Sequence, residues 1–225
     1  MKSLTNFVLE STSQTEKKYR LTDETINVDG RTLYRIEALK AFWGQKKGNK
    51  GGFIEKEDNL SQEGNCWVYD DAKVYDNAKV YGGGMVTRNA SVYGNAQVYD
   101  MAHVRDNAKV YDDAKVYGRG EVISNAKVYG KGEVYDHGKV CSAAEVYEDA
   151  KVYDEAIIYG DVKIYGNAEI YGLAKVEDEA EIYGNAKVYG NAKVSDNAKV
   201  YGNAVVCGRT EIYDNMKINY KYIKK

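Results

Sequence analysis

The stretch Asn185-Ala186-Lys187-Val188-Tyr189-Gly190, followed at once by Asn191-Ala192-Lys193-Val194-Ser195-Asp196, contains the six-residue unit that decides the fold. Every sixth residue from Val68 through Ile218 is Val or Ile, and the residue two places earlier is nearly always Ala or Gly. Within Ala-Lys-Val-Tyr, apolar side chains alternate with polar or amphipathic ones, which is typical of a short strand with Ala and Val inward. The other two positions are mostly Gly or Asp followed by Asn or Asp, and they predict a turn. The unit therefore predicts a repetitive all-β solenoid.

The repeat resembles that of the hexapeptide-repeat family, whose members fold as left-handed parallel β-helices with three hexads in each triangular coil. The resemblance covers about two-thirds of the chain and rests on the inward Val or Ile with Ala two residues before it. It departs from the family at the next position, where Tyr stands instead of a small residue. The segment from Lys18 to Asp70 also resembles the head of hexapeptide-repeat proteins encoded by bacterial viruses and prophages. Together these resemblances imply a left-handed parallel β-helix and a phage-type accessory protein.

Composition narrows the class of protein further. The 225 residues include 22 Tyr, 22 Gly and no Pro, and 32 basic against 34 acidic residues give a net charge of -2. Such a balance lacks the positive surplus of a dedicated nucleic-acid binder, so we do not expect a nucleic-acid partner. No apolar run approaches the roughly 18 residues of a membrane span, and the first residues lack the apolar core of a signal peptide. We expect a soluble, cytoplasmic protein without a membrane partner, in the host bacterium if a phage encodes it.

The pattern divides the chain into four parts: a flexible N-terminus (1–17), an N-terminal cap (18–65), the left-handed β-helix (66–218) and a C-terminal cap or tail (219–225). In the cap, the turn Asp29-Gly30 between two apolar-rich segments predicts a β-hairpin. Ile54 and Leu60 are six residues apart, but their frame is two residues out of step with Val68. This offset predicts an irregular first coil between the hairpin and the regular repeats.

Three hexads per coil would stack residues that are eighteen apart, and the three resulting faces differ. On two faces the outward column is Tyr, from Tyr75 to Tyr201 and from Tyr81 to Tyr189, and the partner column mostly alternates Lys and Glu. Six of the eight non-Tyr residues of the outward column fall on the third face, where the charges do not alternate. The predicted binding face on this side comprises Met85, Thr87, Met101, His103, Arg105, Arg119, Ile123, His137, Cys141, Ile157, Tyr159, Leu173 and Glu177.

Three explanations of this irregular face stay open. The N-terminal cap or the C-terminal tail folds back over it, a second copy of the chain binds it, or a foreign partner binds it. Self-association would use an exposed apolar patch of Met85, Ile123, Ile157, Tyr159 and Leu173. The Tyr columns of the other faces are either a stacking platform for sugars or bases, or rows that stabilise neighbouring strands. The alternating Glu favours the structural interpretation, because a nucleic-acid groove would keep its Lys unopposed.

The family resemblance also implies an enzymatic alternative, because many hexapeptide-repeat proteins are acyltransferases that bind acyl-coenzyme A between subunits and use a His as general base. The repeats contain no inserted loop that would build a substrate pocket, and His103 stands where Lys is usual. We therefore expect no catalytic residue, with His103 as the candidate base if acyl transfer occurs. Cys66, Cys141 and Cys207 lie several coils apart, which excludes an internal disulfide. No Cys/His cluster indicates zinc, and we expect neither metal nor cofactor.

The function favoured by these observations is that of a non-enzymatic, phage- or prophage-type binding protein. Its irregular face would bind, and inhibit or sequester, a host protein or other host factor, for example one that acts in defence. An acyltransferase-like enzyme is the first alternative and a self-assembling structural module the second. We also expect the chain to form a homo-oligomer, because an irregular face with exposed apolar side chains is what a symmetric interface would use.

Overall fold

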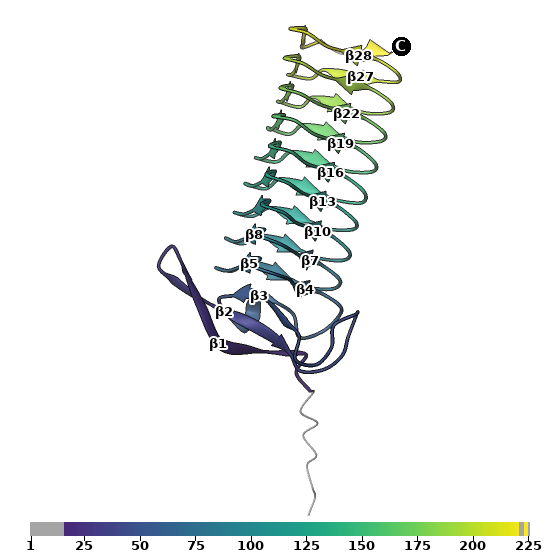
Figure 1. Ribbon diagram of the computed structural model, residues 1–225. Coiled ribbons are helices and arrows are strands. Elements are labelled where there is room, and N and C mark those ends of the chain that lie inside the picture. The colour runs from purple at the N-terminus through teal and green to yellow at the C-terminus, as the bar shows by residue number, and fades with distance from the viewer. Residues whose placement is uncertain (1–15, 221–222, 225) are drawn as a thin grey trace, which may run out of the picture.

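The chain winds into a parallel β-solenoid whose faces are three long sheets, with a strand-rich cap at its N-terminal end (Figure 1). This computed structural model describes residues 16–220 and 223–224. The predicted all-β solenoid fold is confirmed. Of the predicted flexible N-terminus, residues 1–15 lie outside the described residues, as do residues 221, 222 and 225 of the predicted tail.

Most strands are two residues long, and each sheet takes one strand from every coil. Sheet 1 consists of β1 (Tyr19–Val28), β2 (Arg31–Ala38), β3 (Lys50–Ile54), β5 (Lys73–Val74), β8 (Ser91–Val92), β11 (Lys109–Val110), β14 (Lys127–Val128), β17 (Glu145–Val146), β20 (Lys163–Ile164), β23 (Glu181–Ile182), β26 (Lys199–Val200) and β29 (Lys217–Ile218).

Sheet 2 consists of β4 (Trp67–Val68), β7 (Met85–Val86), β10 (His103–Val104), β13 (Glu121–Val122), β16 (Lys139–Val140), β19 (Ile157–Ile158), β22 (Lys175–Val176), β25 (Lys193–Val194) and β28 (Glu211–Ile212). Sheet 3 consists of β6 (Lys79–Val80), β9 (Gln97–Val98), β12 (Lys115–Val116), β15 (Glu133–Val134), β18 (Lys151–Val152), β21 (Glu169–Ile170), β24 (Lys187–Val188), β27 (Val205–Cys207) and β30 (Ile223–Lys224). A 3-10 helix, η1 (Glu57–Asn59), precedes the first regular coil.

The strand register shows that one coil takes eighteen residues. In sheet 2, His103 pairs with Met85 on one side and with Glu121 on the other, and the same spacing holds in sheets 1 and 3. Backbone N–H groups of alternate residues donate to carbonyls of the next coil, as in the bonds from His103 to Gly120 at 2.9 Å and from Arg105 to Val122 at 3.0 Å. Because the pairing is parallel and in register, side chains of one column stack directly on one another.

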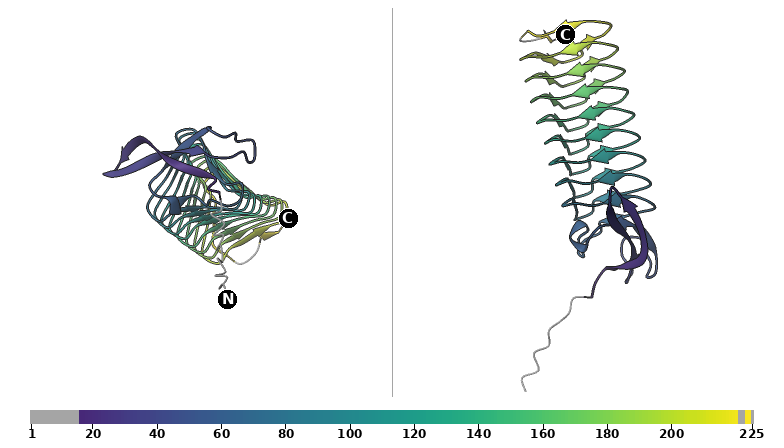
Figure 2. Two further views of the ribbon diagram at one scale, coloured as in Figure 1. Left: turned by 90° about the horizontal axis from the view of Figure 1, so that it is seen from below. Right: turned by 90° about the vertical axis from the view of Figure 1, so that its left-hand side faces the viewer.

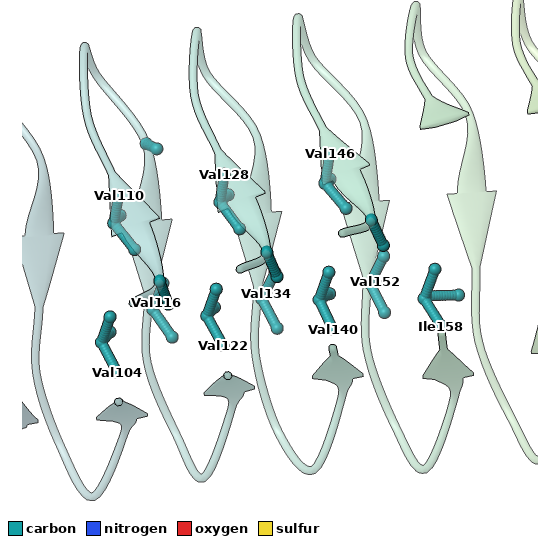
Figure 3. Packing of buried hydrophobic residues seen from close by; sticks show 14 of the residues in the cluster. Val104, Val110, Val116, Val122, Val128, Val134, Val140, Val146, Val152 and Ile158 are labelled. Carbon is teal, nitrogen blue, oxygen red and sulfur yellow. The ribbon is translucent and has the colours of Figure 1, made fainter. Parts of the chain in front are cut away.

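The core is a stack of Val or Ile and Ala side chains inside the solenoid. Val104, Val122 and Val140 come from successive coils, point inward and are fully buried (Figure 3). Each buried Val contributes roughly 1.5–3 kcal/mol before chain entropy is subtracted. The inward positions therefore account for the strict part of the repeat.

The residue that follows the outward Tyr position lies at a corner of the coil. The backbone conformation of this corner explains why it is usually Asp or Gly. Asp112 has φ of 56° and Gly130, in the next coil, has φ of 63°, so both adopt the left-handed conformation that Gly and Asp tolerate best. The carboxylate of Asp112 also accepts the backbone N–H of Gly130 at 3.2 Å. An Asp corner thus links its own coil to the next one, whereas a Gly corner supplies only the conformation.

The cap begins with an antiparallel hairpin of β1 and β2, turned at Asp29-Gly30, and β3 joins it to sheet 1. The hairpin projects sideways from the end of the solenoid (Figure 2). Ile54 pairs with Val74 and Leu60 with Val80, so the first coil spans twenty residues instead of eighteen. This longer coil is the physical origin of the two-residue offset in the sequence.

Buried polar groups close the N-terminal end of the solenoid. The ammonium group of Lys18 is buried and donates to the carbonyl oxygens of Cys66, Glu63 and Gly64 at 3.1, 3.2 and 3.4 Å. The Tyr19 hydroxyl donates to the Leu60 carbonyl at 2.7 Å. These bonds satisfy carbonyl groups that a longer solenoid would pair with another coil.

Candidate functional site

The irregular face is the outer surface of sheet 2 and of the corner that leads into it. The first residue of each sheet 2 strand points outward, and these residues form the central column of the face. The column includes Met85, His103 and Glu121 on the neighbouring strands β7, β10 and β13. Lys139 and Ile157 continue the column on β16 and β19. The structure therefore brings the scattered exceptions of the repeat onto one side of the solenoid.

A second outward column consists of the residues that directly follow the core Val or Ile of each sheet 2 strand. It stacks as predicted, but two of its side chains are buried. The backbone N–H groups of Arg105, Ile123 and Cys141 donate to Val122, Val140 and Ile158, each in the following coil. Ile123 is only 8% exposed and Glu177 only 6% exposed. The prediction that Ile123 belongs to an exposed apolar patch is therefore wrong, because the neighbouring side chains of the stack cover it. Thr87 and Cys141 are half-buried, and Tyr159 is exposed.

The corner column carries the most exposed apolar side chains of this face. Met101 is 50% exposed and Leu173 is 51% exposed. Between them, a guanidinium nitrogen of Arg119 lies 3.4 Å from Nε2 of His137. The shallow groove beside this column is lined by Asp136, His137, Asp154, Glu155, Gly172 and Leu173.

His103 is the titratable group with the most distinctive surroundings on the face. Its Nε2 atom lies 3.2 Å from the hydroxyl oxygen of Thr87, one coil earlier. Burial, followed by the positive charge of Arg105, lowers the pKa of His103 below its ordinary value. The neutral form of the imidazole is therefore favoured, and in that form one ring nitrogen donates a hydrogen bond and the other accepts one.

A compact polar cluster lies in the C-terminal half of the face. The Tyr159 hydroxyl and the Lys193 ammonium group both donate to the Glu177 carboxylate. Burial opposes ionisation of Glu177, but the bonds from Lys193 and Tyr159 outweigh it and lower the pKa of the carboxyl group. Glu177 is thus an internal partner that positions Tyr159 and Lys193, which remain at the surface.

The cap covers the first coil of this face. Phe42 packs edge-on against Trp67 with ring centroids 5.2 Å apart, and Tyr19 packs edge-on against the same ring at 6.0 Å. The last described strand, β30, extends sheet 3 instead of crossing sheet 2. Further along, Met101, Tyr159 and Leu173 remain exposed. The described part of the chain therefore supplies a cover for one end of the face only.

On the two regular faces, neighbouring coils are joined by stacked Tyr rings and by Lys–Glu ion pairs. Tyr111 and Tyr129 stack with ring centroids 4.9 Å apart and planes 1° apart, and the ladders on sheets 1 and 3 repeat this geometry. Lys127 and Glu145 form a 2.8 Å ion pair across successive coils of sheet 1, and the Tyr129 hydroxyl donates to the same carboxylate at 3.0 Å. Stacked rings cover one another's faces, so these ladders stabilise the strands as predicted and leave little ring surface for a ligand.

Comparison with known proteins agrees with the repeat and its geometry. Residues 192–208 match the family model described as YdcK beta solenoid repeat. A 62-residue segment is 40% identical to a protein of Escherichia coli strain K12 named "Uncharacterized acetyltransferase YdcK", and the match covers 24% of this chain and 19% of that protein. The hexad register and the parallel coils define the class of protein, and these matches support it. The chain is a hexapeptide-repeat β-helix protein.

The matched segment of this hexapeptide-repeat protein spans about a fifth of its relative's length, so the comparison concerns the repeats and not a whole enzyme. Within residues 16–220 and 223–224, no group of three or more His, Cys, Asp or Glu side chains is arranged to hold a metal ion. Among the described residues, Cys66 and Cys141 form no disulfide bond. In the same described ranges, none of the helices has the length and apolar character needed to cross a membrane.

Some functional candidates of the hexapeptide-repeat protein were not part of the predicted face. Lys193 was not selected, although it is the cation that holds Glu177, because Lys is the ordinary residue of its column. Trp43 was also missed; it is the most exposed large apolar side chain in the described structure. The available signal was the Trp-Gly pair in the basic segment 38–50, which indicates an exposed aromatic residue in a tight turn.

Proposed function

We propose that this hexapeptide-repeat protein is a non-enzymatic binding protein whose partner docks on the outer surface of sheet 2. The single observation that carries the proposal is the asymmetry between faces of otherwise identical construction. Two faces carry a continuous row of stacked Tyr rings, whereas the third has ion pairs but no such row and exposes Met101, Leu173 and Tyr159. A face that only had to stabilise the solenoid would repeat the ladders of the other two.

The residue types of this face fit a protein partner. Met, Tyr and Arg are enriched at the centres of protein interfaces, and this side presents Met101, Tyr159, Arg105 and Arg119. The His137 groove beside them gives the surface relief that a protruding side chain can fill. The resemblance of the Lys18–Asp70 segment to phage and prophage proteins favours a bacterial host protein as the partner, with inhibition or sequestration as the outcome.

Acyl transfer is the second candidate, and His103 is the observation that favours it. The imidazole is half-buried, lies 3.2 Å from Thr87 and has a lowered pKa, which are properties of a general base. The partial match to a protein named as an acetyltransferase adds to this candidate. Against it, the groove on this side of the solenoid is lined by His137 and Leu173 and not by His103. An acyl-coenzyme A donor would then have to be enclosed by a second subunit.

The experiment that tests the proposal is a chemical cross-linking pull-down from bacterial lysate with a matched pair of double variants. Met101→Glu with Leu173→Glu places charges at the exposed corner of sheet 2. The control, Asn95→Glu with Asn167→Glu, places the same charges six residues earlier, at the corner leading into sheet 3. The proposal predicts a host protein that is recovered with wild type and the control but lost with the sheet 2 variant. Equal recovery with both variants would reject the face.

The same samples separate the enzymatic candidate. Purified wild type is incubated with acetyl-coenzyme A and a mixture of small amine and hydroxyl acceptors, and release of the free thiol of coenzyme A is followed. We expect no release above the buffer rate. Turnover that His103→Ala abolishes would establish acyl transfer and contradict the non-enzymatic proposal.

A further inference from the structure

Trp43 occupies a two-residue turn that normally excludes bulky side chains. The backbone N–H of Gln45 donates to the Phe42 carbonyl at 2.6 Å, and that of Phe42 donates to the Gln45 carbonyl at 3.2 Å. The two central residues, Trp43 and Gly44, have φ of 34° and 76°. Such turns favour Asn, Asp or Gly at their centre, and a bulky residue is strained there. Strain of this kind persists where the side chain has a use.

The turn is anchored, so Trp43 is presented on a fixed base. Phe42 packs against the fully buried Trp67, and the Lys18 ammonium group lies 5.3 Å from the centroid of the Phe42 ring. The Gln45 amide oxygen accepts a 3.3 Å hydrogen bond from the Asn49 side chain. Trp43 itself is 62% exposed. An indole held outward on a rigid turn offers a ring face that another planar group can stack on.

The segment that contains Trp43 is basic, although the chain as a whole carries a charge of -2. Segment 38–54 contains Lys40, Lys46, Lys47 and Lys50 and no acidic residue. Lys50 pairs with Glu24 at 2.8 Å, and Lys40 donates to a backbone carbonyl. Lys46 and Lys47 are exposed, and among the described residues neither is in an ion pair.

We propose that this turn binds single-stranded nucleic acid, with Trp43 stacking on a base and Lys46 and Lys47 contacting the adjacent phosphates. Aromatic stacking combined with lysine contacts to the backbone is the usual way in which proteins bind single strands without sequence preference. Beside this turn, the Asn49 side-chain amide donates to the amide oxygen of Gln45 at 3.3 Å. The proposal is independent of the partner of sheet 2, because it uses residues of the cap alone.

An anionic membrane is the other surface that a basic turn with an exposed Trp could meet. Insertion into lipid requires an apolar surface larger than one ring. Trp43 is the only exposed large hydrophobic residue of the described cap, residues 16–65, and the residues that follow it are Gly, Gln, Lys and Asn. The composition of the turn therefore favours nucleic acid.

The test uses the intrinsic fluorescence of the intact chain with a twelve-residue oligothymidylate as probe. The chain has two Trp, and Trp67 is fully buried, so a change in indole emission on addition of the oligonucleotide reports on Trp43. Stacking predicts quenching. Lys46→Gln with Lys47→Gln should lower the slope of log affinity against log salt by about 0.7 per lysine. The matched control, Lys79→Gln with Lys109→Gln, removes two exposed lysines of the solenoid and should leave the slope unchanged.

The decisive variant is Trp43→Asn, because Asn tolerates the left-handed conformation and keeps the turn folded. Its affinity for a fluorescently labelled oligonucleotide, followed by anisotropy, should fall about tenfold or more, while its thermal midpoint stays equal or rises. Unchanged affinity of Trp43→Asn, or no quenching of wild type at low salt, would overturn the proposal. Quenching by phosphatidylserine vesicles without quenching by the oligonucleotide would overturn it in favour of membrane binding.

Discussion

The tyrosine ladders should ionise at much higher pH than free tyrosine. Burial, followed by the charge of Glu133, raises the pKa of Tyr135 to about 12. Burial, followed by the neighbouring Tyr165, raises the pKa of Tyr147 to about 12. Both rings lie inside continuous stacks, with ring centroids 4.8 to 5.0 Å from the next rings. A phenolate formed there loses hydration and meets negative charge from its neighbours.

The size of the effect follows from the two pKa values. At pH 11 an ordinary Tyr with a pKa of about 10 is roughly nine-tenths ionised, whereas a group with a pKa of about 12 is roughly one-tenth ionised. A raised acid pKa favours the neutral, folded form. The corresponding stability is complete below about pH 10 and is lost as the pH rises through the folded-state pKa values. We therefore expect alkaline unfolding to accompany ionisation of the ladders.

The assay is absorbance at the phenolate band near 295 nm, titrated from pH 8 to 13 for native protein and for protein in concentrated urea. We expect the native curve to lag the denatured one for most of the tyrosines. Glu133→Gln should shift part of the native curve to lower pH, because it removes a charge that opposes ionisation of Tyr135. Glu121→Gln, on sheet 2, is the control and should not shift the ladders. Superimposed native and denatured curves would refute the stacked, half-buried ladders.

Three further predictions concern stability, each measured by chemical denaturation. Val128→Ala should lower the free energy of unfolding by about 2–3 kcal/mol, whereas Lys109→Ala on the surface should change it by less than about 0.5 kcal/mol; equal effects would contradict the packed core. Hydrogen bonds from Lys127 and Tyr129 outweigh burial and lower the pKa of Glu145, so its contribution is complete above about pH 4.5 and is lost as the pH falls further; Glu145→Gln should flatten this acid dependence. Asn59→Ala should cost about 2 kcal/mol, because two carbonyl groups at the end of the solenoid lose their donor; a neutral result would show that water replaces it.

The solenoid can be predicted from the sequence because the most regular positions, Val or Ile at every sixth residue, are also the side chains that fill the core. Val or Ile at every sixth position is needed to fill the core, so the period of the core can be read directly and the eighteen-residue coil follows. The first coil is predictable only in part. The offset of Ile54 and Leu60 indicates an irregularity, but its cause is the twenty-residue pairing with Val74 and Val80, which depends on the cap packing around Lys18.

The candidate face was predicted at the level of columns but not of single side chains. Residue spacing indicates which positions share a face, and the pairing of His103 with Met85 and Glu121 agrees with that prediction. Spacing says nothing about how far a side chain protrudes, and for that reason Ile123 was expected to be exposed although its stack covers it. The exposure of Trp43 was not predicted, because Trp43 lies in the cap outside the repeats. Its exposure depends on how the cap packs against the solenoid.

The most direct test of the central claim is pyrene excimer emission from two labelled cysteines that are eighteen residues apart. In a Cys141→Ser background, Lys175→Cys with Lys193→Cys places both labels on adjacent strands of sheet 2, about 4.8 Å apart in the stacking direction. Lys175→Cys with Lys187→Cys places labels twelve residues apart on sheets 2 and 3. Strong excimer emission from the first pair and monomer emission from the second are predicted. Equal excimer emission from both pairs, or emission only from the twelve-residue pair, would contradict the eighteen-residue coil. The residues of the irregular face would then not lie on one side of the solenoid.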